Sequence, residues 1–126
     1  MRLLLVSLLL LVLSTDASAC GCFSSEARAK TAQEALQLAR VAVYGRVVEV
    51  GSNGTAKVLV LESFKGYASG STFEALPATS QCKTAPFSVK EEALFLSFGE
   101  AVTACDKHPP EHYLLEVFRA KAAKAR

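Results

Sequence analysis

Residues 41–65 read VAVYGRVVEVGSNGTAKVLVLESFK. Both ends of this stretch are rich in valine and other residues that favour strands. Between them, Gly51-Ser52-Asn53-Gly54 contains the Asn-Gly pair that is typical of tight hairpins. Gly45 interrupts the first half, where a glycine indicates a bulge or bend. We therefore predict a hairpin of two long antiparallel strands, from Val41 to Val50 and from Lys57 to Lys65.

Further strand signals follow the hairpin. The expected elements are a turn at 66–71, a strand from Thr72 to Leu76, a loop from Pro77 to Pro86, and strands from Ala93 to Phe98 and from Val102 to Cys105. Their aromatic side chains are expected to pack in the core, namely those of Tyr44, Phe64, Phe95 and Phe98. The prediction is a mainly β fold, an OB-fold-like antiparallel barrel of five strands. The pattern alone does not distinguish this barrel from an open sheet covered by helices.

A helix is expected on each side of the strands. On the N-terminal side, Ser24 or Ser25 is the expected N-cap of a helical segment that reaches Ala39. One face of this segment carries an apolar stripe, made of Ala32, Ala35, Leu36 and Ala39. On the C-terminal side, Pro109-Pro110 blocks continuation of a strand, and residues from Glu111 to Lys124 favour a helix.

Residues 1–19 have the order of a secretory signal peptide. Arg2 precedes an apolar run from Leu3 to Leu13, and Ala17-Ser18-Ala19 forms a small-residue cleavage site. As a helix, that run spans about 16 Å, short of the roughly 30 Å core of a bilayer. We therefore expect a secreted, extracellular protein, or a periplasmic one in a Gram-negative bacterium. A lipoprotein signal, with Cys20 acylated, is the alternative.

Removal of residues 1–19 leaves one expected domain, residues 20–126, with room for one modest core. The net charge of the chain is +2, which does not indicate a nucleic-acid-binding surface. No nucleophile–base motif or phosphate-binding glycine loop is present, so we expect neither an enzyme nor a cofactor. His108 and His112 lack the HExxH order of zinc proteases, and the prolines between them prevent a helix. We expect a monomer without a membrane span.

Four cysteines in a short secreted chain predict two disulfides. A bond between Cys20 and Cys22 is disfavoured, because one intervening residue closes a strained ring. Two crossing pairings remain, and each ties the N-terminus to Cys82 and Cys105. A structural zinc site is a competing interpretation, but such sites usually contain two pairs of cysteines separated by two to four residues.

Several motifs follow one another along residues 20–105, namely Cys20-Gly21-Cys22, Val43-Tyr44-Gly45-Arg46-Val47-Val48, Ser63-Phe64-Lys65-Gly66-Tyr67, Ser80-Gln81-Cys82, Ala93-Leu94-Phe95-Leu96 and Cys105. Their order and spacing resemble the netrin-like module. More narrowly, they resemble the N-terminal domain of the tissue inhibitors of metalloproteinases. The resemblance implies an OB-fold barrel with two disulfides, Cys20–Cys82 and Cys22–Cys105.

The resemblance also implies a function. In that family the α-amine and the carbonyl of the first cysteine chelate the catalytic zinc of a metalloprotease. Here that residue is Cys20, and the expected inhibitory ridge is formed by Cys20, Gly21, Cys22, Phe23, Ser80 and Gln81. The chain departs from the family at Gly21, which has no side chain to enter the specificity pocket of the protease. The alternatives are a netrin-like binding module without inhibitory activity and a lipid-anchored envelope protein of the same fold.

Overall fold

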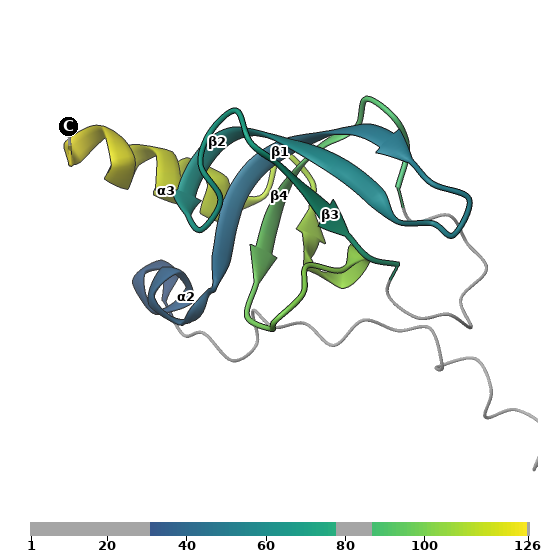
Figure 1. The fold of residues 1–126 in the computed structure, drawn as a ribbon. Coiled ribbons are helices and arrows are strands. Elements are labelled where there is room, and N and C mark those ends of the chain that lie inside the picture. The colour runs from purple at the N-terminus through teal and green to yellow at the C-terminus, as the bar shows by residue number, and fades with distance from the viewer. Residues whose placement is uncertain (1–30, 78–86, 126) are drawn as a thin grey trace, which may run out of the picture.

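The structure is a computed structural model that describes residues 31–77 and 87–125. Its elements are drawn in Figure 1 and comprise α2 (Ala32–Leu38), β1 (Val41–Val50), β2 (Ala56–Lys65), β3 (Thr72–Ala75), β4 (Glu92–Ser97), a 3₁₀ turn η3 (Ala104–Asp106), β5 (Lys107–His108) and α3 (Tyr113–Lys124). The fold is therefore mainly β, with the two described α-helices at one end of the sheet.

The predicted hairpin is confirmed. β1 and β2 pair antiparallel, and Gly51 closes the turn by donating its N–H to the Thr55 carbonyl at 2.9 Å. The register shifts between Tyr44 and Gly45, as expected for a bulge. Gly45 is required there, because a Cβ at this position would lie 2.6 Å from Cγ1 of Val58. The bulge therefore lets the two strands approach closely while the sheet bends.

The strands of the described residues form one antiparallel sheet in the order β3-β2-β1-β4-β5. This sheet is not closed into a barrel, so the predicted closure is wrong for this part of the chain. A single parallel bridge, Leu76 to Thr103, links the two edges within residues 31–77 and 87–125. β3 and β5 are too short to extend that contact into a ladder, because they contain four and two residues.

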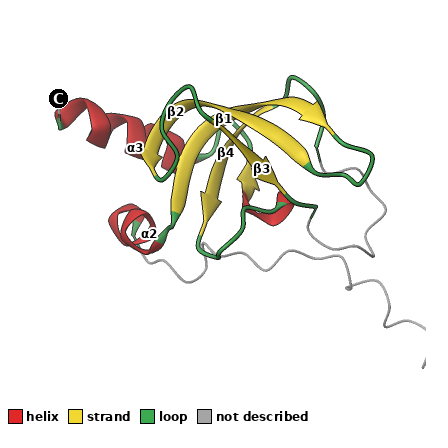
Figure 2. Ribbon diagram, in the orientation of Figure 1, coloured by secondary structure: helices red, strands yellow, loops and turns green. Residues whose placement is uncertain are grey.

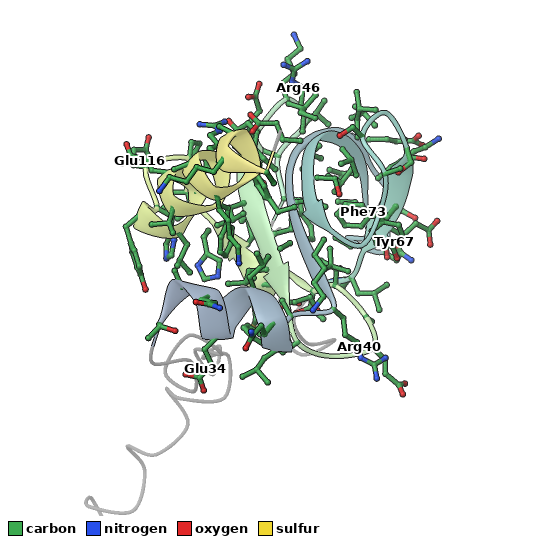
Figure 3. All side chains as sticks on the ribbon, turned by 90° about the vertical axis from the view of Figure 1, so that its left-hand side faces the viewer. Glu34, Arg40, Arg46, Tyr67, Phe73 and Glu116 are labelled. Carbon is green, nitrogen blue, oxygen red and sulfur yellow. The ribbon has the colours of Figure 1, made fainter. Side chains whose placement is uncertain are left out.

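β1 and β4 carry buried side chains on both faces of the sheet. Successive side chains of a strand point to opposite faces, so each of these strands contributes to two cores. One face builds a strand-side core, composed of Val43, Val47, Ala56, Val58, Val60, Phe73, Ala75, Phe87, Ala93, Phe95 and Val102. The other face meets the helices in a helix-side core, composed of Ala35, Ala39, Ala42, Tyr44, Leu94, Leu96, Leu114, Leu115 and Phe118. In Figure 3, Phe73 lies within the curl of the strands, with Tyr67 beside it.

The expected apolar stripe of the N-terminal helix is confirmed. Ala35 and Ala39 belong to the helix-side core, and Ala32 and Leu36 pack against it. α2 begins after Thr31, whose hydroxyl accepts a hydrogen bond from the N–H of Glu34 at 3.1 Å. The expected N-caps Ser24 and Ser25 lie outside the described residues.

The opposite end of α2 is capped from the sheet. Lys65, the last residue of β2, donates its ammonium to the carbonyls of Leu36 and Gln37 at 3.0 and 2.8 Å. A cation at this end also favours the helix dipole. Lys65 therefore ties the end of the hairpin to the helix that covers it.

The predicted strand from Val102 to Cys105 is wrong. Thr103 caps η3, because its hydroxyl accepts the N–H of Cys105 at 3.2 Å. Asp106 completes a capping box by accepting the N–H of Thr103 at 2.8 Å. These local bonds turn the backbone, and only the following two residues pair with β4 as β5.

Asp106 is a buried carboxylate in this turn. Burial raises the pKa of Asp106 above its ordinary value of 3.8, although hydrogen bonds from Thr103 and Ser97 and the charge of His108 oppose the rise. The folded protein therefore binds the Asp106 proton more tightly than the unfolded chain does.

The C-terminal helix starts at Tyr113, two residues later than the predicted Glu111. His112 is its N-cap, and Nδ1 of this histidine accepts the N–H of Leu114 at 3.3 Å. Within the described ranges, neither α2 nor α3 is long and apolar enough to cross a membrane.

Substitution of Gly45 by alanine is expected to lower the free energy of unfolding by about 1–3 kcal/mol, because the new methyl group overlaps Val58 in a packed core. Gly99→Ala is the matched control, since a Cβ there has its nearest neighbour at 3.9 Å. Urea unfolding measures both variants. An equal effect of the two substitutions would contradict the close approach at Gly45.

Replacement of Asp106 by asparagine is expected to change the pH dependence of stability. The raised pKa of Asp106 means that the wild type loses stability, relative to Asp106→Asn, as the pH rises from about 4 towards 7. Urea unfolding of both proteins at several pH values measures the difference. If the stability of the wild type relative to Asp106→Asn is constant with pH, or increases as the pH rises, burial does not dominate at this carboxylate.

Candidate functional site

Most of the predicted site residues lie outside the described residues. This applies to the expected zinc-chelating residue Cys20 and to the rest of the ridge, Gly21, Cys22, Phe23, Ser80 and Gln81, and also to Cys82. Cys105 alone among these residues belongs to the described part of the chain. The ridge and the disulfides therefore stay predictions, and the structure contributes the scaffold around Cys105.

Cys105 is a half-buried residue in the middle of η3. Its backbone N–H donates to the hydroxyl of Thr103, and the carboxylate of the next residue, Asp106, accepts the N–H of Thr103. Both sides of Cys105 are thus fixed by the capping box. A rigid turn of this kind presents a side chain at a defined position.

The described residues that precede the segment carrying Cys82 lie beside this turn. Leu76 donates its N–H to the carbonyl of Val102 at 2.8 Å, and its own carbonyl accepts the N–H of Ala104 at 2.8 Å. Figure 2 shows η3, a short red coil, next to the end of β3. Leu76 and Pro77, the last described residues before position 78, therefore adjoin the turn that contains Cys105.

The described residues that follow position 86 lie beside β5. Phe87 is 3% exposed and packs in the strand-side core with Phe95 and Val102. The ammonium of Lys107 lies 5.2 Å from the Phe87 ring centroid and 3.1 Å from a carboxylate oxygen of Glu91. That carboxylate also accepts the N–H of Ser88 at 3.0 Å. Both flanks of segment 78–86 are therefore anchored against the η3–β5 region.

The tip of the β1–β2 hairpin reaches the same side. A Cβ built on Gly54 would lie 3.6 Å from the Cβ of Pro77, which is ordinary van der Waals contact. Pro77 therefore contacts the hairpin tip, and its neighbour Leu76 is bonded to η3, although these parts are far apart in the sequence. The sequence predicted the hairpin and the loop but gave no signal of their contact.

A polar network that the sequence did not predict covers the helix side of the sheet. Tyr44 is 9% exposed, and its hydroxyl donates to Glu92 at 2.8 Å while Arg46 donates to the same carboxylate at 2.8 Å. From α3, Arg119 forms a forked ion pair with Glu62 and stands 5.0 Å from the Tyr44 ring centroid. The network joins β1, β2, β4 and α3.

The electrostatics of this network are those of a structural element. Burial and the hydrogen bond to Glu92 raise the pKa of Tyr44. Hydrogen bonds from Arg46 and Tyr44 lower the pKa of Glu92. A tyrosine that holds its proton more tightly beside a carboxylate that stays ionised is a poor nucleophile–base pair. The contact of the network with α3 is made by Arg119, which pairs with Glu62 and faces the Tyr44 ring.

The two histidines lie close together, with ring centroids 4.6 Å apart. Nδ1 of His112 accepts the N–H of Leu114 in the first turn of α3, so this nitrogen serves to cap the helix. No cluster of three or more possible metal ligands occurs among residues 31–77 and 87–125.

Comparisons with known proteins give no relative on which to rest an assignment. No family model, no curated protein sequence and no solved structure matches this chain.

Proposed function

We propose that this chain is a secreted inhibitor of zinc metalloendopeptidases that binds the protease zinc through the mature N-terminal Cys20. The observation that carries the proposal is the position of Cys20-Gly21-Cys22 directly behind the cleavage site Ala17-Ser18-Ala19. Cleavage there frees the α-amine of a cysteine that two bridges would hold in place.

The chemistry of that terminus fits a zinc ligand. A catalytic zinc keeps one coordination position for water or substrate. An α-amine has an ordinary pKa of about 7.7–8.0, so its neutral form is accessible near neutral pH. The amine and the carbonyl of Cys20 can then replace the water together. Disulfides at Cys20 and Cys22 reduce the entropy lost on binding, because the ligand atoms are already ordered.

The scaffold supports this arrangement in two ways. The strand order β3-β2-β1-β4-β5, with a parallel bridge between Leu76 and Thr103, agrees with an OB-type fold, which is a partly open barrel of five strands. Leu76 and Phe87 anchor the flanks of the Cys82 segment beside the turn of Cys105. Bridges Cys20–Cys82 and Cys22–Cys105 would then hold the terminus against one end of the sheet.

A second function is a netrin-like module that binds another extracellular protein, with the cysteines purely structural. Gly21 favours this alternative, because it offers no side chain to the specificity pocket of a protease. A lipid-anchored form of the same fold requires acylation of Cys20 and leaves three cysteines, an odd number for pairing. Intact mass and N-terminal sequencing of the secreted protein separate the lipid-anchored form from the other two.

We predict disulfides Cys20–Cys82 and Cys22–Cys105 in the mature protein, with no free thiol. Peptide mapping without reduction tests the pairing, and a Cys20–Cys105 peptide would refute it. The double substitution of Cys22 and Cys105 by alanine is expected to cost about 2–5 kcal/mol of unfolding free energy, the range for loss of a native bridge in a small secreted domain.

We predict weak inhibition of zinc endopeptidases that depends on the terminal amine. Acetylation of the Cys20 amine, or one alanine added ahead of Cys20, is expected to abolish inhibition by removing or displacing the zinc ligand. Gly21→Thr is expected to strengthen inhibition about tenfold, because methyl-sized groups buried in the specificity pocket contribute about 1–2 kcal/mol. Inhibition constants for several proteases measure all three changes.

Two results of this series would count against the proposal in different ways. Inhibition that survives acetylation would show that the protein does not act through zinc, although it is an inhibitor. No inhibition at high micromolar concentration, even by Gly21→Thr, would reject the inhibitor and favour the binding module. Gly99→Ala serves as a control for the variants, since residue 99 lies in a turn outside the proposed ridge.

A further inference from the structure

The tip of the β1–β2 hairpin contains a sequence that neither the fold nor the proposed function requires. Asn53-Gly54-Thr55 is an N-x-T sequon, and Asn53 is the one asparagine in the whole sequence. The hairpin would also close with aspartate at this position, because its carboxylate oxygen can accept the same N–H of Thr55. Neither the turn nor the proposed function requires a threonine two residues later, so the pairing of Asn53 with Thr55 calls for a chemical explanation.

The backbone of the tip is well defined. Gly51 and Thr55 close the loop with a bond of 2.9 Å, and the N–H of Gly54 donates to the carbonyl of Gly51 at 3.0 Å. Gly54 has a φ of 85°, the left-handed conformation that a glycine adopts without strain. The sequon thus lies on a tight turn whose geometry is fixed by its own backbone.

Asn53 is exposed, and its side chain is oriented by the sequon itself. Its Oδ1 accepts the N–H of Thr55 at 3.1 Å. This bond uses the carbonyl oxygen of the amide, so the amide nitrogen Nδ2 is the group left for other chemistry. The same turn brings the threonine next to the asparagine, which is the pairing that defines the acceptor motif.

A large group attached to Asn53 would not disturb the cores. Gly51, Ser52 and Asn53 are all exposed, Gly54 and Thr55 are half-buried, and the first fully buried residue is Ala56 at the start of β2. The groove next to the tip is lined by the polar side chains of Thr55, Lys57 and Glu74, among others, and by those of Phe73 and Leu76. Sugar hydroxyls over such a surface replace water and require no new apolar contact.

We propose that Asn53 is an N-glycosylation acceptor and that its glycan stands over the hairpin tip. The reaction joins Nδ2 of Asn53 to the anomeric carbon of a lipid-diphosphate oligosaccharide. The bond from that carbon to the diphosphate breaks, the lipid diphosphate leaves, and Nδ2 loses one proton. The site depends on the secretion in the proposed function, because the donor and its transferase occupy the secretory route.

The test is expression of the full chain in a eukaryotic secretory host, in two forms. One form keeps residues 1–19, and the other carries a proven leader in their place. Intact mass before and after peptide N-glycosidase treatment reports the glycan, and treatment in heavy-oxygen water labels residue 53 as it becomes aspartate. A parallel incubation in the same water without the enzyme corrects for spontaneous deamidation of the Asn-Gly pair, which takes up the same label.

Three variants localise the modification. Asn53→Gln and Thr55→Ala are both expected to abolish the increase in mass that the glycan causes. Thr55→Ala does so although it leaves Asn53 intact. Thr55→Ser is the matched control and is expected to retain it, because serine keeps the hydroxyl. Urea unfolding of the glycosylated protein and of Asn53→Gln is expected to give free energies within about 0.5 kcal/mol, as for other surface changes.

The two forms of the chain separate failure of the site from failure of the leader. Glycan on both forms supports the site and secretion together. Glycan only on the form with the proven leader supports the site and rejects residues 1–19 as a signal peptide. An unmodified Asn53 in secreted protein with the proven leader overturns the proposal. So does a glycan that persists in Thr55→Ala, because the hydroxyl would then play no part.

Discussion

The fold depends on the burial of both faces of β1. This strand pairs with β2 on one side and β4 on the other, and its side chains alternate between the two cores. Val43 and Val47 fill the curl of the sheet, while Ala42 and Tyr44 meet the helices. A strand with one solvent face could not link these layers. Gly45 bends the strand where the two requirements meet, since only a residue without a side chain fits against Val58.

The helices are held to this strand by polar as well as apolar contacts. Leu114, Leu115 and Phe118 supply the buried face of α3. Arg119 and Lys65 add charged contacts at the rim, to Glu62 and to the end of α2. An exposed ion pair alone contributes little to stability. Here the Arg119 guanidinium also faces the Tyr44 ring, so it joins α3 to both β1 and β2.

The η3–β5 region gathers the parts of the chain on which the proposed inhibition would depend. It contains Cys105, and it anchors both flanks of the segment that carries Cys82. The contacts are made by backbone bonds of Leu76 and by the buried ring of Phe87. Such contacts do not depend on a bound partner. A terminus joined there by disulfides would be ordered before it met a zinc ion, which is the condition for an effective chelating group.

The sequence by itself determined the hairpin, its bulge, the helical stripe of residues 32–39 and the helix after Pro110, because each follows from local turn chemistry or side-chain periodicity. The proposed site at Cys20 is also a sequence inference, and it lies outside the described residues. The turn of residues 102–105 is local as well, because Thr103 and Asp106, three residues apart, form a capping box that the strand-like composition concealed. Tertiary structure decided that Leu76 adds only a single bridge to Thr103. It also decided that Tyr44, an expected core residue, carries a hydrogen bond to Glu92 and lies under Arg119. Those partners are 48 residues or more away in the chain, so no local pattern could predict them.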